Sequence, residues 1–381
     1  MTHQDQALTD RQTDRQTGKK ERQTNIELLR IVSMVMIVFH HFAVHGGFNW
    51  DTATVTIPHL WYNLIVMGGK IGVDVFVLIS GYFLITSHGS LFDFKRILKF
   101  WGQIIFYSLG IYGLSLLFHI QNYGMKIVVF PITFSSWWFA STYFVLYLIH
   151  PFLNMFLNAL SKKTYQTLLV MLVIMWSIIP TFTMQSFESN SLSWFVTIYA
   201  IAGYARLYGF NPKITTKGYF AMWAVFTALT YLSSLVFTLL ATKRSAFSGY
   251  ITYFYGMEKI SVLLISLTLF MAFATLKMDY HKWINILATA TFGVYLIHDS
   301  NIIRPYLWLN LFQNYQYQDS LLLIPYSIIV VLLVYVVCTA IDLIRKKVFE
   351  KPYVHIVNKY AYKVLKPFEK ICDLCRKLVF G

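Results

Sequence analysis

The stretch ELLRIVSMVMIVFHHF, from Glu27 to Phe42, begins the first long apolar run of the chain and decides how the rest is interpreted. The run is long enough for a membrane-spanning helix, yet it contains an acid, an arginine and two adjacent histidines. Ionisable groups at membrane depth are costly, so they normally face a bundle interior or a wet cavity. This helix therefore predicts both a membrane fold and a polar site inside it.

The apolar character of this run extends along the whole chain. Of the 381 residues, 57% are hydrophobic and only 13% are charged, which is too apolar for a soluble domain of this length. We expect an all-α polytopic bundle of about ten transmembrane helices. The predicted spans lie near residues 26–46, 63–86, 100–120, 137–158, 166–180, 193–208, 218–242, 252–276, 284–303 and 321–344.

Lys and Arg residues are distributed unevenly between the two sides that this topology creates. With the N-terminus inside, 25 of the 32 cationic residues fall in segments on the cytoplasmic side. This asymmetry follows the positive-inside rule and predicts that both termini are cytoplasmic. The net charge of +15 then reflects topology and attraction to anionic membrane lipids, and we expect no nucleic-acid partner.

The two ends differ in composition from the membrane domain, which we assign to residues 25–345. Residues 1–24 repeat the triplet RQT among polar residues and are expected to form a disordered cytoplasmic arm. Residues 346–381 place apolar residues every three or four positions between lysines, which is typical of a basic amphipathic helix on the inner membrane surface or packed on the bundle. A lone C-x-x-C at Cys372 and Cys375 is weak evidence for a metal, and we expect none.

On a helical projection, Glu27, Arg30 and His41 share one stripe of the first span, whereas His40 points elsewhere. Glu27 and Arg30 lie near the cytoplasmic end, and His41 lies roughly 16 Å from Arg30 along the axis. One interpretation is an ion pair that anchors the helix end, with a hydrogen-bonded core histidine. The other is a polar path, which three such residues on one face favour, and in which neutral His41 acts as a base.

Lys70 and Asp74 lie one turn apart in the second span, within GGKIGVDVFVLISGYFLI at residues 68–85. They form either a structural ion pair or part of a substrate path, and the glycines around them permit close helix packing. Both interpretations place the two charges inside the bundle.

Lys95, Arg96 and Lys99 follow at the cytoplasmic boundary of the third span. They serve as topology signals, or they bind the phosphates of a cytoplasmic donor, for which arginine has the better geometry. The spacing alone does not separate these alternatives.

Polar aromatic residues interrupt the fourth and ninth spans near their outer ends. By spacing alone they are typical of the aromatic belt at a membrane interface, and they are also candidates for a substrate path. These residues are Trp138, Tyr143, Tyr295 and His298.

Together these stretches resemble the acyltransferase 3 family of integral-membrane acyltransferases. The motifs run in the family's order from about residue 25 to 345 and cover nearly all of the membrane region. They are the pair Arg30 and His41 separated by ten residues, GVDVFVLISGY, the basic step at Arg96 and Lys99, SSWWF, and FGVYLIHD.

The resemblance implies a ten-helix bundle of the bacterial plasma membrane. Such a bundle takes an acyl group, commonly acetyl, from cytoplasmic acyl-CoA and delivers it to a hydroxyl of a cell-envelope glycan or lipid-linked sugar. By position, His41 corresponds to the family's essential histidine and Arg30 to its arginine partner, while Arg96 and Lys99 match the basic motif that faces the CoA phosphates. The sequence departs from the pattern at Lys99, where arginine is usual, and at Gly102, where proline is frequent.

Our leading hypothesis is that His41 removes a proton from the acceptor hydroxyl, or transiently relays the acyl group, while Glu27 and Arg30 orient the donor. The alternative is a multi-pass transporter without covalent chemistry, because intramembrane charges mark both classes. An inverted repeat with paired broken helices would favour transport, and the sequence does not display one.

Overall fold

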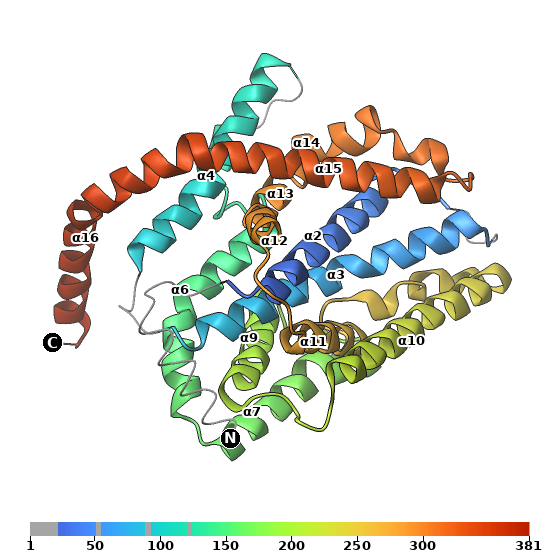
Figure 1. Ribbon diagram of the computed structural model, residues 1–381, viewed down its shortest axis with the longest axis horizontal. Coiled ribbons are helices and arrows are strands. Elements are labelled where there is room, and N and C mark those ends of the chain that lie inside the picture. The colour runs from blue at the N-terminus through green and yellow to red at the C-terminus, as the bar shows by residue number, and fades with distance from the viewer. Residues whose placement is uncertain (1–21, 51–54, 88–92, 120–123, 381) are drawn as a thin grey trace.

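The computed structural model describes residues 22–50, 55–87, 93–119 and 124–380, so most of the predicted arm at residues 1–24 lies outside the described residues. The described part of the chain is helical and contains no β-strand (Figure 1). Its elements are α2 (Thr24–Val44), α3 (Ile57–Leu84), α4 (Phe94–Leu117), α5 (Met125–Val129), α6 (Trp138–Ala159), α7 (Lys162–Val173), η1 (Ile174–Ile178), α8 (Ile179–Thr183), α9 (Ser191–Tyr208), α10 (Thr216–Lys243), η2 (Ser245–Tyr250), η3 (Tyr253–Tyr255), α11 (Ile260–Thr275), α12 (Lys282–Ala288), α13 (Thr291–His298), α14 (Ile303–Pro305), η4 (Tyr306–Leu311), η5 (Asn314–Tyr317), α15 (Leu323–Arg345), η6 (Lys346–Glu350) and α16 (Lys351–Phe380).

The all-α polytopic fold predicted from the sequence is confirmed. Among the described residues, eight helical segments are long and apolar enough to cross a membrane. A ninth candidate is a bent pair, Lys282–His298 and Ile303–Tyr317, which meet at 87°. The remaining predicted span, residues 193–208, corresponds to α9, which is helical but less apolar, because it carries polar residues and Arg206 while packing inside the bundle.

Side chains flanking the helices fix where several of them begin. The Thr56 hydroxyl accepts a hydrogen bond from the His59 amide at the start of α3, and the Asp93 carboxylate accepts one from the Arg96 amide at the start of α4. Such caps satisfy amide groups that have no partner within the helix. α6 has no side-chain cap of this kind.

Glycines allow α2 and α3 to pack closely at the centre of the molecule, where Figure 1 shows the two blue helices side by side. A Cβ added at Gly72 would lie 2.6 Å from the Ser33 carbonyl oxygen, and one at Gly69 would lie 2.2 Å from the His40 ring. Only glycine leaves room for this approach, as the small-residue rule for membrane helices predicts. The close contact brings His40 of α2 against α3.

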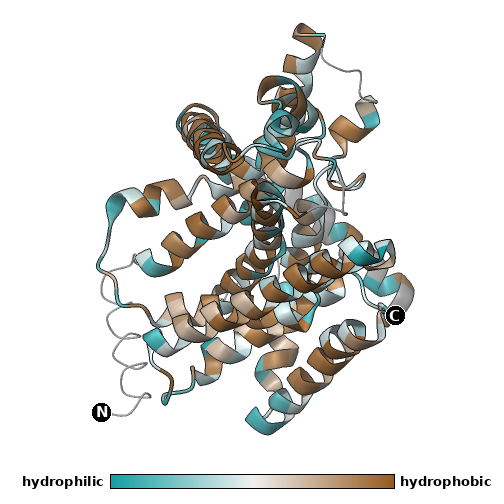
Figure 2. Cartoon of the chain, turned by 90° about the vertical axis from the view of Figure 1, so that its right-hand side faces the viewer, coloured by the Kyte–Doolittle hydropathy of each residue, from teal (hydrophilic) through white to brown (hydrophobic). Residues whose placement is uncertain are grey.

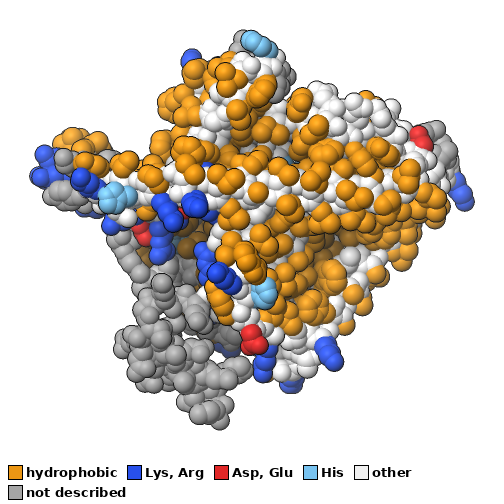
Figure 3. Space-filling view, turned by 45° about the horizontal axis from the view of Figure 1, so that its top comes forward, with side chains coloured by type: hydrophobic (Ala, Val, Ile, Leu, Met, Phe, Trp, Pro, Cys, Tyr) orange, Lys and Arg blue, Asp and Glu red, His pale blue; other side chains and the backbone are white. Residues whose placement is uncertain are grey.

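The outer faces of the long helices are apolar. In Figure 2 most hydrophilic residues lie toward helix ends, and in Figure 3 hydrophobic side chains cover much of the face along α15. Ile329, Val336 and Ile344 of α15 are all exposed. Apolar residues exposed in this density are expected to face lipid, so the protein is a multi-pass membrane protein.

α16 extends past the bundle toward the C-terminus (Figure 1) and contacts α4 near its own start. The Tyr353 hydroxyl donates to the Leu98 carbonyl oxygen at 2.8 Å. A Cβ added at Gly102 would lie 2.6 Å from the Tyr353 ring, so this glycine leaves space for the aromatic ring. The packing of α16 on α4 thus gives a physical reason for the glycine at this position.

Candidate active site

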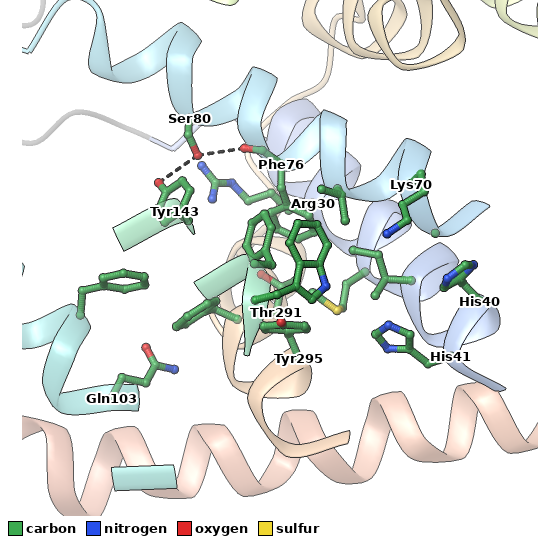
Figure 4. Close-up of a pocket in the computed structure, with 18 residues that line it drawn as sticks. Arg30, His40, His41, Lys70, Phe76, Ser80, Gln103, Tyr143, Thr291 and Tyr295 are labelled. Atoms are coloured by element: carbon green, nitrogen blue, oxygen red, sulfur yellow. Dashed lines mark hydrogen bonds between the residues drawn. The ribbon is translucent and has the colours of Figure 1, made fainter. Parts of the chain in front are cut away.

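A cavity of about 250 Å³ lies inside the bundle, and we call it the central cavity. Five helices, α2, α3, α4, α6 and α13, contribute its walls, which are mainly aromatic and aliphatic with a few polar groups (Figure 4). This composition is typical of a small-molecule site. The lining residues are Arg30, Met34, Ile37, His40, His41, Gly69, Lys70, Val73, Phe76, Ser80, Phe100, Gln103, Trp138, Phe139, Tyr143, Thr291, Phe292 and Tyr295.

Arg30 and His41 both line the central cavity, and Figure 4 shows their side chains at separate places along it. His40 lines it as well, so the expectation that His40 points elsewhere is wrong. The reason lies in α3, because the absent side chain of Gly69 leaves space for the His40 ring. The His40 Nδ1 hydrogen-bonds the Val66 carbonyl oxygen at 2.7 Å, which holds the ring in that space.

A chain of hydrogen bonds fixes the tautomer of His41. The Nδ1 of His298 lies 2.6 Å from the Val294 carbonyl oxygen, which can only accept, so this nitrogen carries a proton. In a neutral ring the Nε2 of His298 is then an acceptor, and it lies 2.9 Å from Nδ1 of His41. His41 therefore donates through Nδ1, and its Nε2 keeps an unprotonated lone pair.

A polar cluster continues beyond His41 toward the end of α2. The buried Asp299 has an oxygen 3.7 Å from His41 Nδ1 and 4.0 Å from His45 Nε2, and it accepts a hydrogen bond from Arg304 at 3.1 Å. Burial and then the charge of Arg304 lower the pKa of His45, which follows the end of α2, to about 3. His45 is therefore neutral at physiological pH.

His41, His45 and Asp299 offer three atoms within 4.8 Å of one another, a spacing that could hold a metal ion. Two of these atoms are already engaged, because Asp299 pairs with Arg304 and Nδ1 of His41 donates to His298. A cation would also meet the positive charge of Arg304. The donor set therefore suits a hydrogen-bonded cluster better than a metal centre.

A second cavity of about 570 Å³ adjoins the central cavity at the start of α2, and we call it the basic mouth. Arg22, Glu27 and Lys99 line it; Glu27 pairs with Arg30 at 3.7 Å, and Lys99 pairs with Glu350 at 2.8 Å. Four residues line both cavities, so the two cavities are adjacent and share part of their walls. The shared residues are Arg30, Gln103, Thr291 and Phe292.

Of the three cations predicted to face a donor, only Lys99 lines the basic mouth. Arg96 is 67% exposed and pairs with Asp93 at 2.9 Å, one turn earlier at the start of α4. Lys95 is exposed, and neither Lys95 nor Arg96 lines the central cavity or the basic mouth. A role for these two residues in donor binding stays a prediction.

Lys70 and Asp74 face different surroundings and, within the described residues, form no ion pair. The Lys70 ammonium lies over the Trp138 ring, 4.8 Å from its centroid, and both residues line the central cavity. Asp74 is buried away from the cavity and accepts a hydrogen bond from the Trp194 indole of α9 at 3.1 Å. Lys70 thus belongs to the candidate path, whereas Asp74 joins α3 to α9.

The predicted path residues of α6 and α13 lie at or next to the central cavity. The Tyr143 hydroxyl donates to Ser80 at 3.0 Å, as the dashed line in Figure 4 marks. Tyr295 lines the cavity, and His298 lies behind His41 as its hydrogen-bond acceptor. Aromatic residues near the ends of the predicted spans, which by spacing alone are typical of a membrane interface, therefore line the central cavity or lie directly behind it.

Sequence reasoning missed a buried network beside the basic mouth. The fully buried Asp342 of α15 accepts hydrogen bonds from Gln103 at 3.2 Å, Tyr107 at 2.7 Å and Arg345 at 2.8 Å. Lys346 lies 3.2 Å from the other carboxylate oxygen. A carboxylate near the end of an apolar span was the available signal, since such groups are rarely placed there without a partner.

These features define a class, a polytopic membrane protein with a polar site enclosed by its helices. The family model Acyl_transf_3, described as an acyltransferase domain, matches residues 23–343. The chain therefore belongs to the acyltransferase 3 family, as its motifs predict, and is a membrane acyltransferase. No curated protein and no solved structure matches the chain.

Proposed function

We propose that the protein is an O-acyltransferase, with acetyl as the acyl group, of the bacterial plasma membrane. It takes the acyl group from cytoplasmic acyl-CoA and delivers it to a hydroxyl of a cell-surface polysaccharide or lipid-linked sugar. The observation that carries the proposal is the hydrogen-bond chain that leaves a lone pair on Nε2 of His41, in a cavity that adjoins the basic mouth. No second candidate has an observation of equal weight.

The donor is proposed to enter through the basic mouth. Support comes from Arg22, Arg30, Lys99 and Lys346, whose positive charges suit the phosphates of CoA. Segments on this side also carry most of the chain's Lys and Arg, which favours a cytoplasmic orientation. The roughly 16 Å rise from Arg30 to His41 along α2 is close to the reach of an extended pantetheine arm.

The acceptor is proposed to approach from the other end of α2. Support comes from a shallow pocket of about 560 Å³ beside the His41 cluster. His45 and Arg304 offer hydrogen-bonding groups there, and Val44 and Leu309 offer apolar surface. Sugar hydroxyls bind to such mixed walls, and His45 lies one helical turn from His41.

In the proposed reaction, Nε2 of His41 removes the proton of the acceptor hydroxyl as its oxygen attacks the thioester carbonyl carbon. A C–O bond forms, the carbonyl oxygen becomes an oxyanion, and His41 becomes an imidazolium. Asp299, 3.7 Å from Nδ1, offers a negative charge for that imidazolium. The C–S bond then breaks, and the thiolate takes the proton from His41, which yields the ester and the free thiol.

Acetyl-labelled acetyl-CoA and membranes that contain the wild type, His41→Gln or the control His150→Gln test the proposal. His150 lies on α6 outside both cavities. We expect label in envelope glycan with the wild type and His150→Gln and a loss of at least about 10²-fold with His41→Gln. Equal transfer by all three would refute the role of His41. No transfer by the wild type would refute acyl transfer from acetyl-CoA, and uptake of small metabolites would then be the assay.

A further inference from the structure

The N-terminus of α6 faces the central cavity without a cap. The helix starts at Trp138, its N-cap residue Trp137 makes no side-chain hydrogen bond to it, and Trp138 and Phe139 line the cavity. The first amide groups of a helix have no acceptor within the helix, and they carry the positive end of its dipole. This end of α6 therefore presents donors and positive potential to the space beside Trp138.

A second, independent feature points to the same place. The Tyr295 side chain is 4% exposed and lines the central cavity, yet its hydroxyl has no hydrogen-bond partner among the described residues. The backbone amides of Phe139 and Ala140 are close to that hydroxyl. Figure 4 shows the Tyr295 ring in the middle of the cavity. The two amides are directed at the Tyr295 oxygen, and the Tyr295 hydroxyl proton has no acceptor among the described residues.

Tyr295 is also held in a fixed relation to His41. Tyr295 and His298 are three residues apart on α13 and so share a face of that helix, with ring centroids 6.4 Å apart. His298 in turn accepts the hydrogen bond from His41 at 2.9 Å. Tyr295 and His41 therefore both neighbour His298, and both line the central cavity.

We propose that the Tyr295 hydroxyl, whose oxygen faces the amides of Phe139 and Ala140, is the hydrogen-bond donor of an oxyanion hole for the tetrahedral intermediate of acyl transfer. The assignment rests on the proposed function. As the acceptor oxygen bonds to the thioester carbon, the carbonyl electron pair moves onto the carbonyl oxygen, which becomes the acceptor that the Tyr295 hydroxyl lacks. When the C–S bond breaks, that pair re-forms the carbonyl.

A purely structural role would leave the tyrosine hydroxyl unexplained. A buried hydroxyl without a partner costs free energy, and phenylalanine would fill the same space against Phe139, whose ring centroid lies 5.7 Å from that of Tyr295. A preorganised donor aimed at the position where negative charge develops lowers the free energy of the transition state, and this is usually the largest single contribution to catalysis. The class of ligand is thus a carbonyl that turns into an oxyanion.

Tyr295→Phe tests the assignment, with Tyr335→Phe as the matched control. Tyr335 of α15 also has a buried hydroxyl without a partner among the described residues, but it lies outside the central cavity. We expect Tyr295→Phe to lower kcat by about 10²-fold with KM for acetyl-CoA unchanged, because the donor acts only in the transition state. Tyr335→Phe keeps the kcat of the wild type, and thermal melting in detergent verifies that both variants fold.

The possible outcomes separate this assignment from the proposed function. An active wild type with an equally active Tyr295→Phe would overturn the oxyanion hole alone. A rise in KM at constant kcat would also overturn it, because the hydroxyl would then bind the ground state. A wild type that transfers no label from acetyl-CoA would refute the proposed function and this assignment with it.

Discussion

His298 offers the sharpest test of how hydrogen bonding fixes the tautomer of His41. His298→Phe removes the acceptor of the Nδ1 proton of His41 while it retains a ring of similar size. A buried donor left without a partner costs about 1–3 kcal/mol, which favours other tautomers and ring orientations of His41. At about 1.4 kcal/mol per tenfold change in rate, kcat should fall about 5- to 150-fold.

His298→Gln is the matched variant, because its side-chain carbonyl oxygen can occupy the position of Nε2 and accept the same proton. Label transfer from acetyl-CoA, measured as kcat and KM for each variant, should show loss with Phe and substantial recovery with Gln. KM should stay constant, since His298 touches His41 and does not line the cavity. Equal activity of His298→Phe and the wild type, or equal loss in both variants, would refute the tautomer argument.

Two further predictions concern the basic mouth. Lys99→Gln should raise KM for acetyl-CoA about two- to fivefold at unchanged kcat, because the exposed ammonium adds modest electrostatic attraction, while Glu350 keeps its ion pair with Arg345. Lys163→Gln, at an exposed lysine outside both cavities, is the control and should leave KM unchanged. Asp342→Asn should destabilise the protein by about 3–5 kcal/mol, because it breaks a buried pair with Arg345, and its melting temperature in detergent should fall. The exposed Asp373→Asn is the control and should leave the melting temperature unchanged.

The sequence was sufficient for features that depend on one helix. Arg30 and His41 are eleven positions apart, which is close to three helical turns, so a projection places them on one face. The apolar runs likewise predict the helices, because length and composition decide whether a segment can cross a membrane. Local periodicity therefore supplied the fold class and the axis of the candidate site.

Features that depend on a neighbouring helix could not be predicted in this way. His40 reaches the cavity because Gly69 of α3 leaves room for it, and Asp74 turns from Lys70 because Trp194 of α9 offers a donor. The network around Asp342 joins α4 to α15 across more than two hundred residues. Each case depends on which helices pack together. The periodicity within one helix does not identify its neighbours.

The hydrogen-bond chain also bears on which of the two proposed roles His41 takes. As a base, His41 gains a proton on Nε2 and keeps the one on Nδ1, which leaves a cation 3.7 Å from an oxygen of Asp299. As an acyl relay, it would hold the acyl group on Nε2 as a cation unless the Nδ1 proton moved to His298. His298 would then become positive, because its own Nδ1 proton is donated to the Val294 carbonyl oxygen. The base role therefore needs no proton transfer to His298, whereas a neutral acyl-imidazole does, and we favour the base role.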